Sequence, residues 1–443
     1  MYKMVRVRYG RPMTAARPHA APAPAASAPG SAPAVIRGDA MRRANLGALL
    51  REVHQAPCTR SDLVERTGLT RAAVGSLLAT LTEAGLVVER AGADPAPERR
   101  RPGRPSLVVD CDPRPAALAC EITADALSLA VIGLGGRVLA RSTVEHLTDG
   151  DVHPSGDASP STSPTSPAAI AERLGREARE LLAALPVDTV VLGVGVAVAG
   201  VVQRSSGRVV VAPNLGWEDV PLAEVVGAVL DRDLPVAVAN EADLGLLAEC
   251  RRGAAVGAAD VVYVSAEAGV GGGVLVGGRP VHGAGGYAGE LGHVPVRPDG
   301  EACRCGAHGC WETEIGEAAL LRRAGRSPGA GRRGVAWLET RARVGDAAAA
   351  EAFAETGRWV GAGLAGLVNL LNPEVAVLGG YLASAFDLVG PAALAELSAR
   401  ALSVTRADVR VVPAHLGADA ALVGAAELAF ERVLADPLLV ARA

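Results

Sequence analysis

Three cysteines crowd into eight residues, Cys303 to Cys310, in a chain of 443 residues that holds only seven cysteines. His293 lies ten positions before the first of them, and His308 lies among them. One histidine and three cysteines complete the tetrahedral ligand set of a structural zinc site, with no position left open for water. Glycines between the cysteines let the backbone bend around an ion. This segment therefore predicts a loop folded around Zn²⁺, held by Cys303, Cys305, Cys310 and one of the two histidines.

Beyond residue 110, short runs rich in valine alternate with amphipathic stretches, which is the pattern of an α/β fold with a largely parallel sheet. The expected strands include Thr189–Val198, Val236–Ala239, Val261–Ser265 and Val375–Leu378, and the expected helices include Leu222–Leu230, Leu244–Arg252 and Arg358–Leu371. A chain of this length predicts two or three domains.

Two segments have the composition of disordered chain. Residues 1–38 are rich in Ala and Pro, and residues 149–167 are rich in Ser, Pro and Thr. The start codon could lie as late as Met41. We expect a DNA-binding domain at 39–110 and a sensing domain at 111–443. The odd cysteine count, with neither a secretory signal nor a convincing membrane span, predicts a cytoplasmic protein that does not bind membranes.

Charge is divided unevenly along the chain. Residues 1–110 hold 17 Arg and Lys against 9 Asp and Glu, a net of +8, whereas the remainder holds 27 against 39, a net of −12. A basic head on an acidic body is expected where one end of a chain meets nucleic acid. Residues 1–40 contribute 6 of the basic residues, so a basic tail explains part of the excess.

Three helices are expected before residue 86. The first runs from about Arg42 to His54. The second follows Thr59, whose hydroxyl can form a capping box with Asp62, and it ends at Gly68. The third runs from its N-cap Thr70 to Ala84, before Gly85, with one apolar face formed by Val74, Leu77, Leu78 and Leu81.

Two short helices joined by a turn with glycine, the second of them amphipathic, are typical of a helix-turn-helix; the alternative is a small helical bundle. The third helix would then enter the major groove, with base contacts from Arg71 and phosphate contacts from Thr70 and Ser76. The expected DNA-facing residues of this helix are Thr70, Arg71, Ala72, Gly75 and Ser76.

A basic hairpin follows the third helix. Leu86–Arg90 and Leu107–Val109 read as strands, and the arginine-rich segment between them is typical of the tip of a wing. Arginines of such a tip suit the minor groove. The residues concerned are Arg99, Arg100, Arg101 and Arg104. The expected partner is double-stranded operator DNA, read by a homodimer or a dimer of dimers, because helix-turn-helix proteins commonly read two half-sites.

The segment Glu290-Leu291-Gly292-His293 and the following Cys303-Arg304-Cys305-Gly306-Ala307-His308-Gly309-Cys310-Trp311-Glu312 resemble the signature of the ROK family (repressors, open reading frames, kinases). The resemblance covers residues 115–430, and a winged head is the usual fusion in the repressor branch of that family. It implies a two-lobed, actin-like fold of the ribonuclease H type, with a sugar bound between the lobes. It also implies His293, rather than His308, as the fourth zinc ligand.

Two further segments resemble the family's sugar site: Pro213-Asn214-Leu215-Gly216-Trp217 and Asn240-Glu241-Ala242-Asp243. The resemblance implies that a sugar or sugar phosphate is held by Asn214, Asn240, Glu241, Glu290, His293 and Glu312. Carboxylates and amides suit this role because they hydrogen-bond to sugar hydroxyls. His293 could serve twice, with one ring nitrogen on zinc and the other directed at the sugar.

The positions that bind phosphate in the family's kinases are altered. The Asp-x-Gly-Gly-Thr loop is replaced by residues 121–125 without glycine, and the aspartate base after Asn240 is replaced by Glu241. Gly269 to Gly273 keep the second loop, but Glu267 precedes it. We therefore expect a sugar-responsive DNA-binding regulator, a repressor, without catalysis. The alternatives are an ATP-dependent sugar kinase with an accessory DNA-binding domain, and a regulator that answers to a partner protein.

Overall fold

A computed structural model of the chain describes residues 34–91, 107–146, 165–230 and 233–442. The chain divides into two compact units, residues 1–41 and 42–443. Of the first unit, the described part is the beginning of helix α1. All contacts given below lie within the second unit.

Three helices form the head, as predicted. They are α1 (Ala34–Gln55), α2 (Arg60–Thr67) and α3 (Arg71–Glu83). Thr59 caps α2 in a capping box with Asp62, and Gly68 ends the helix in the left-handed conformation, with φ of 68°. The hydroxyl of Thr70 accepts the N–H of Ala73 and so caps α3. Both signals act locally, which is why the sequence located these two helices correctly.

The wing is a small antiparallel sheet with strand order β1-β3-β2. Its strands are β1 (Cys58–Thr59), β2 (Val87–Ala91) and β3 (Leu107–Cys111). The two long strands confirm the predicted hairpin, with Glu89 opposite Val109. Strand β1 has only two residues and no pattern that sequence reasoning could detect. The tip of the wing, with Arg99, Arg100, Arg101 and Arg104, lies outside the described residues.

Three helices begin earlier than predicted. Helix α6 (Glu241–Arg252) begins at Glu241, not Leu244, after its N-cap Asn240. Helix α1 begins at Ala34, eight residues before Arg42 and inside the segment expected to be a tail. Helix α10 begins at Ala347, not Arg358, after the carboxylate of Asp346 caps its first turn. The added turns of α10 are rich in alanine, which has the highest helix propensity but gives no amphipathic pattern to read.

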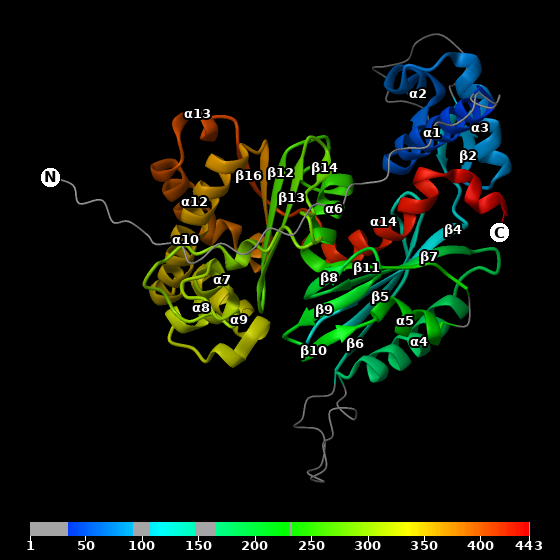
Figure 1. Cartoon of the computed structure of the whole chain (residues 1–443). Coiled ribbons are helices and arrows are strands. Elements are labelled where there is room, and N and C mark those ends of the chain that lie inside the picture. The colour runs from blue at the N-terminus through cyan, green and yellow to red at the C-terminus, as the bar shows by residue number, and fades with distance from the viewer. Residues whose placement is uncertain (1–33, 92–106, 147–164, 231–232, 443) are drawn as a thin grey trace, which may run out of the picture. The chain divides into compact units, whose positions relative to one another are not determined.

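The body contains two five-stranded sheets with the same topology (Figure 1). The first has order β6-β5-β4-β7-β11 and the second β14-β13-β12-β15-β16. In each, three antiparallel strands are followed by two parallel strands on the other side of the first strand. This duplicated arrangement is the predicted two-lobed, ribonuclease H-like fold.

The strands of the first sheet are β4 (Pro115–Ile122), β5 (Ala126–Gly133), β6 (Val138–Glu145), β7 (Val190–Val198) and β11 (Val236–Asn240). Those of the second are β12 (Val261–Ala266), β13 (Val270–Val276), β14 (Arg279–Pro280), β15 (Val375–Gly380) and β16 (Arg410–Pro413). A third sheet of the body consists of β8 (Val201–Gln203), β9 (Arg208–Ala212) and β10 (Trp217–Val220).

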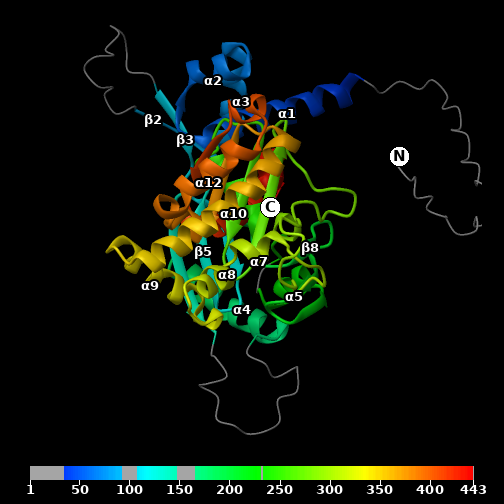
Figure 2. The same ribbon diagram turned by 90° about the vertical axis from the view of Figure 1, so that its left-hand side faces the viewer.

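The helices of the body are α4 (Pro167–Ala183), α5 (Leu222–Val229), α6 (Glu241–Arg252), α7 (Trp311–Ile315), α8 (Glu317–Arg323), α9 (Gly331–Arg343), α10 (Ala347–Leu371), α11 (Tyr381–Ser384), α12 (Phe386–Arg400), α13 (Ser403–Arg406) and α14 (Ala420–Ala435). Helices α10 and α12 lie side by side (Figures 1 and 2). Helix α14 packs on α6 and on strands β4 and β7 of the first sheet.

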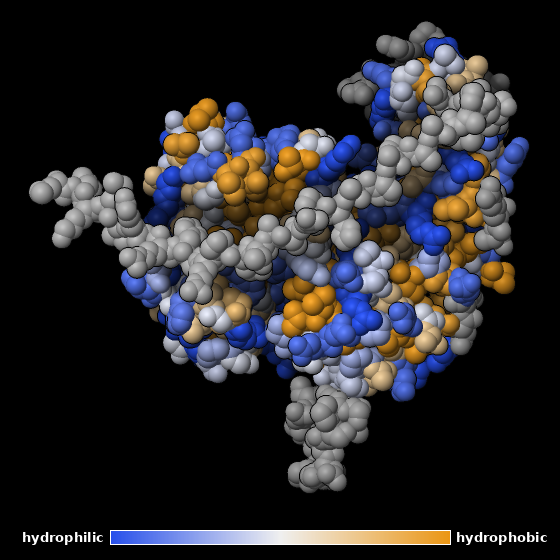
Figure 3. Space-filling model, viewed as in Figure 1, coloured by the Kyte–Doolittle hydropathy of each residue, from blue (hydrophilic) through white to orange (hydrophobic). Residues whose placement is uncertain are grey.

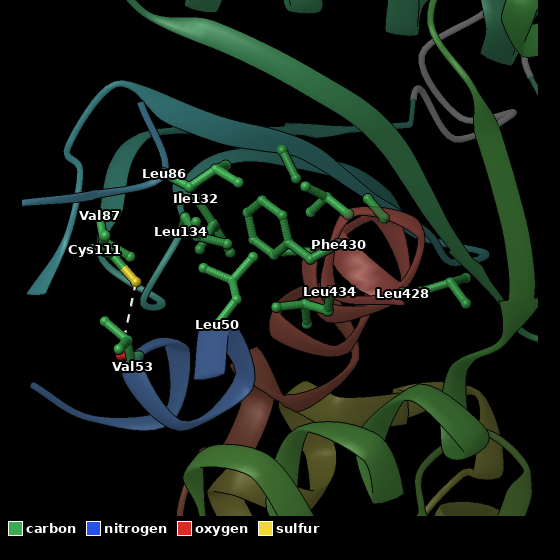
Figure 4. Packing of buried hydrophobic residues seen from close by; sticks show 14 of the residues in the cluster. Leu50, Val53, Leu86, Val87, Cys111, Ile132, Leu134, Leu428, Phe430 and Leu434 are labelled. Carbon is green, nitrogen blue, oxygen red and sulfur yellow. Dashed lines mark hydrogen bonds between the residues drawn. The ribbon is translucent and has the colours of Figure 1, made fainter. Parts of the chain in front are cut away.

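One hydrophobic core joins the head to the first sheet. Leu50 and Val53 of α1 belong to the same buried cluster as Phe430 and Leu434 of α14, and Leu50 and Phe430 are fully buried (Figure 4). Between these helices, the guanidinium of Arg51 donates to the carbonyl of Leu434 at 2.8 Å. The head therefore rests on the last long helix of the chain.

The surface of the body is mixed in character. On the face seen in Figure 3, hydrophobic residues form patches separated by hydrophilic ones. Among the described residues, no helix combines the length and the apolar character that a membrane crossing requires.

Candidate functional site: a recognition helix, a metal-ligand cluster and an acidic cleft

The outer face of α3 carries the predicted DNA-contacting residues. Thr70, Arg71, Ala72 and Ser76 are exposed, whereas the opposite face of the helix is buried in the head. Gly75 is partly buried, yet a Cβ placed on it would meet nothing within 4 Å. The N-terminal half of this helix is thus smooth and open, as a helix that enters the major groove must be.

Neighbouring arginines of the head differ from Arg71 in their partners. Arg60 makes two bonds to the carboxylate of Glu89, at 2.6 and 2.7 Å, and Arg66 lies 3.4 Å from Glu52. Arg71 has neither an ion pair nor a hydrogen bond to any described side chain. Its guanidinium is therefore available for an outside acceptor.

The four predicted metal ligands come together. The ligand atoms of His293, Cys303, Cys305 and Cys310 all lie within 4.8 Å of one another. The Sγ of Cys303 is 3.6 Å from His293 Nδ1, and the Sγ atoms of Cys305 and Cys310 are 3.6 Å apart. Zinc–sulfur bonds of about 2.3 Å at tetrahedral angles need sulfur separations of roughly 3.8 Å, so the set fits a tetrahedral ion. His308 is exposed and lies outside the cluster.

Backbone contacts fold the loop around the cluster. The amide of Cys303 donates to the carbonyl of Ala307 at 2.8 Å, and isolated bridges pair Pro295 with Cys310 and Ala302 with His308. Gly309 has φ of 66°, and a Cβ on it would lie 1.6 Å from the carbonyl oxygen of Arg297. No other residue could occupy this position without moving the loop.

Glu312 and Asn214, both predicted to contact sugar, meet at the metal loop. Arg304, between two of the cysteines, donates to Asn214 Oδ1 at 2.7 Å, and it lies 3.9 Å from Glu312 Oε1. The other oxygen of Glu312 accepts the amide of Val270 at 3.0 Å. The loop thus connects a residue near the third sheet with the beginning of β13 in the second sheet. Sequence reasoning missed Arg304, which no motif distinguished.

A pocket lies beside this loop. It is lined by Asn240, which caps α6, by Asp243 of α6 and by Glu290. The remaining lining residues come from β8, β13 and the segments beside them: Gly200, Val201, Val202, Gly271, Gly272, Gly286, Tyr287, Ala288 and Gly289. Burial raises the pKa of Glu290; His293 opposes this rise and Glu312 adds to it, so these three groups are close enough to interact electrostatically. Asp243 was not predicted as a pocket residue. Burial, helped by Glu290 and opposed by Arg204, raises its pKa to about 6.

Asn240 has a structural task at the same place. Its Oδ1 accepts the amides of Ala242 and Asp243, at 2.7 and 3.3 Å, and its Nδ2 donates to the carbonyl of Gly200 at 2.9 Å. It thereby caps α6 and ties the helix to the turn after β7. The residue expected to bind sugar also fixes where α6 begins.

Glu241 is the first residue of α6. Its Oε2 is buried and finds no hydrogen-bond partner among the described residues. Burial raises its pKa to about 8, and the charges of Glu267, Glu290 and Glu121 act in the same direction. The side chain is therefore mostly protonated at neutral pH.

Further carboxyl groups with raised pKa values lie near Glu267. Glu121 is the next-to-last residue of β4, and its pKa is raised to about 7 by burial and then by Glu267. The pKa of Glu317 is raised to about 7 for the same two reasons. Arg332 pairs with Glu267 at 2.7 Å. Acidic groups that raise one another's pKa would repel a phosphate.

Comparisons with known proteins agree with this architecture. The sequence profile of the ROK family matches residues 119–432, and that of the MarR family matches residues 47–100. The glucokinase of Streptomyces coelicolor is 33% identical over 293 residues, which cover 62% of this chain and 90% of that protein. The xylose repressor of Bacillus subtilis is 25% identical over 398 residues, or 89% of this chain and 97% of that protein.

A crystal structure described as a ROK family transcriptional regulator, a homolog of the E. coli MLC protein, superimposes with a TM-score of 0.70 at 25% identity. The match covers 91% of this chain and 99% of the other. Fold and site together define a two-lobed, sugar-kinase-like body that carries a winged-helix head. The chain belongs to the ROK family, and its head is of the MarR type, which confirms the resemblance found in the sequence.

The buried carboxyl of Glu241 makes stability depend on pH. Because its folded pKa of about 8 lies above the ordinary value of 4.5, the folded state holds the proton more tightly, and stability falls as pH rises from about 4.5 to 8. Glu241→Gln removes this loss. We expect the variant to exceed the wild type by about 1–3 kcal/mol at pH 8 and to approach it below pH 5, measured by urea unfolding without ligand.

The exposed Glu218→Gln variant is the matched control and should follow the wild type at every pH. Parallel pH profiles for Glu241→Gln and the wild type would contradict the assignment of a buried, protonated Glu241.

Proposed function

We propose that this protein is a sugar-responsive DNA-binding transcriptional regulator, a repressor, in which residues 39–110 bind the operator and residues 111–443 sense the sugar. The observation that carries the proposal is the open recognition face of α3 in a head that shares one hydrophobic core with a ROK body. Similarity to the B. subtilis xylose repressor along 89% of the chain supports it. A homodimer would present two such heads to two half-sites.

The effector pocket in this proposal combines the two groups of residues around the metal loop. Glu290 and His293 would accept and donate to sugar hydroxyls, with Glu312 and Asn214 at the metal-loop end and Asn240 and Glu241 at the start of α6. A sugar is the fitting class of ligand because its vicinal hydroxyls need several fixed acceptors and donors. Closing the two lobes around it would change the equilibrium between conformations of different operator affinity.

The ion in the metal loop would be a structural zinc. Three thiolates and one imidazole suit zinc, and a closed set of four ligands leaves no position for a reacting water. Because Nδ1 of His293 faces the cysteines, Nε2 remains for the sugar. The ion would thus orient one pocket residue directly and Glu312 through the loop.

The carboxyl groups around Glu267 support a sensor without catalysis. Glu121 begins the stretch that replaces the first phosphate loop of the family's kinases, and Glu267 precedes the second loop. Glu241 holds its proton at neutral pH instead of accepting one. A protonated group cannot serve as the general base for a sugar hydroxyl. The second candidate, a sugar kinase, is favoured by the similarity to the glucokinase of S. coelicolor.

The function is tested by operator binding with and without sugar. We expect the protein to bind DNA from its own promoter region. We also expect one member of a panel (D-xylose, D-glucose, N-acetylglucosamine or glucose 6-phosphate) to change the affinity at least about fivefold, the usual lower limit of coupling between sites. Fluorescence anisotropy at fixed salt measures both quantities. If the protein shows no sequence-specific binding to this DNA even at low salt, the proposal is refuted.

Arg71→Ala separates recognition from sensing. Removing one bidentate base contact is expected to weaken operator binding by about 1–3 kcal/mol, roughly 5- to 150-fold, and to leave the sugar-induced thermal shift unchanged. The control is Arg279→Ala, which removes an exposed arginine from β14 in the second sheet. Equal losses of operator affinity in both variants would argue against readout by α3.

Kinase activity is tested by ATP consumption in the presence of hexoses and amino sugars, with the S. coelicolor glucokinase as a positive control. We expect no turnover above background. We expect none from Glu241→Asp either, because Glu121 and Glu267 would still repel phosphate. Robust sugar-dependent turnover by the wild type would overturn the non-catalytic assignment in favour of the kinase.

Metal content is measured by elemental analysis of purified protein. We expect one zinc per chain in the wild type and in Cys250→Ser, whose cysteine lies outside the cluster, and less than one in Cys305→Ser. The Cys305→Ser protein should also lose the thermal shift given by the effector, because His293 is no longer oriented. Unchanged zinc in Cys305→Ser would contradict the ligand set.

A further inference from the structure

Helix α6 connects the pocket to the head. Asn240 and Asp243, at its beginning, line the pocket, and Arg252, its last residue, contacts the head. Its 12 residues span about 18 Å at 1.5 Å per residue. A single rigid element therefore reaches from the effector site to the DNA-binding domain.

The contact at the far end is a buried trio of an arginine, a glutamate and a histidine from three distant parts of the chain. Arg252 Nε donates to Glu427 Oε1 of α14 at 2.5 Å, and His54 Nε2 of α1 lies 2.8 Å from Glu427 Oε2. The second nitrogen of Arg252, Nη1, donates to the carbonyl of Gly135 at 2.8 Å. His54 and Glu427 are 2% and 3% exposed, so water does not screen this contact.

The trio is built so that each member depends on the others. The amide of Gly135 donates to His54 Nδ1 at 3.0 Å, and His54 Nε2 lies 2.8 Å from both Glu427 Oε2 and Arg252 Nη2. Burial alone would raise the pKa of Glu427, but the hydrogen bond and charge of His54 and the charge of Arg252 outweigh it and hold the pKa at about 2. Moving either partner would leave a buried carboxylate unpaired, which is unfavourable.

Helix α14 keeps this contact in register with α6. A Cβ on Gly424 would lie 2.0 Å from the carbonyl oxygen of Leu244, so the two helix backbones touch one turn before Glu427. On its other side, α14 carries Phe430, which packs edge-on against the ring of His54 with centroids 5.5 Å apart. A shift of α6 would therefore move α1 in two ways: through the packing of α14 between the two helices, and through the contacts of Arg252 with Glu427 and His54.

We propose that α6 transmits the effector state of the pocket to the DNA-binding head, and that Arg252 is the positioning residue through which its movement reaches His54. The proposal rests on the proposed function, since it explains how a sugar at the start of α6 changes operator affinity. Arg252 touches neither sugar nor DNA. By linkage, operator binding changes sugar affinity by the same factor.

The test compares two adjacent arginines of α6 in the full-length protein. Arg252→Gln removes the contact with Glu427. Arg251→Gln makes the same change of charge at a residue with no ion pair or hydrogen bond to the described side chains. For each variant and the wild type, operator affinity is measured with and without D-xylose and D-glucose, and sugar affinity is measured by calorimetry.

We expect the ratio of operator affinities with and without sugar to fall below about twofold in Arg252→Gln and to stay at the wild-type value in Arg251→Gln. Sugar affinity without DNA should remain within about threefold in both, because the pocket is about 18 Å away. If Arg252→Gln keeps the wild-type ratio of operator affinities with and without sugar, the proposed transmission through Arg252 is wrong. If the wild-type protein itself shows no response to any sugar that binds, the proposed function fails first.

Hydrogen exchange gives a readout that does not require DNA. It also shows whether each variant is folded, because a folded variant still binds sugar. In the wild type, sugar should change the exchange of amides in residues 44–55 of α1. In Arg252→Gln and His54→Gln, the same sugar should still protect the beginning of α6 while exchange in α1 stays unchanged. A sugar-dependent change in α1 that persists in both variants would overturn the proposal.

Discussion

The packing of α14 between the head and the first sheet is the constraint on which the rest depends. Leu50 of α1 and Phe430 of α14 are fully buried in one cluster, so the head cannot separate from the body without exposing apolar surface. The buried Glu427 fixes the relative positions of α1, α6 and α14, because its carboxylate contacts both His54 and Arg252. A DNA-binding domain held in this way is placed where a change in the body can move it.

The body itself is organised around a metal-ligand loop and a helix start that face the same pocket. Cys303 and its partners set the position of His293, and Arg304 ties the loop to Asn214. Asn240 ends β11 and caps α6, so one residue joins the expected sugar site to the element that leads to the head. In the proposed function, binding and transmission would thus share their first residue.

A group of carboxyl groups around Glu267 supports the proposed sensor over a phosphate-transfer enzyme. Glu121, Glu241 and Glu317 have raised pKa values, first through burial and then through the negative charge of Glu267. Such a group of acids is costly to keep in a fold, and it opposes any phosphate. The proposed function uses this chemistry directly, because a sensor needs the sugar pocket of the family without the nucleotide chemistry.

The sequence by itself determined the local features: the caps of α2 and α3 at Thr59 and Thr70, the α/β class, and the set of cysteines around His293, each readable because its signal lies within a few residues. The resemblance carried by these cysteines also gave the family and its duplicated lobes. Only the tertiary structure decided which distant groups meet. His54 and Glu427 are separated by 373 residues, and no spacing or periodicity relates them. Their contact depends on how two helices and a sheet pack, and so does the burial of Glu241 Oε2 without a hydrogen-bond partner among the described residues. Burial and charge pairing are properties of the folded environment and not of the residue.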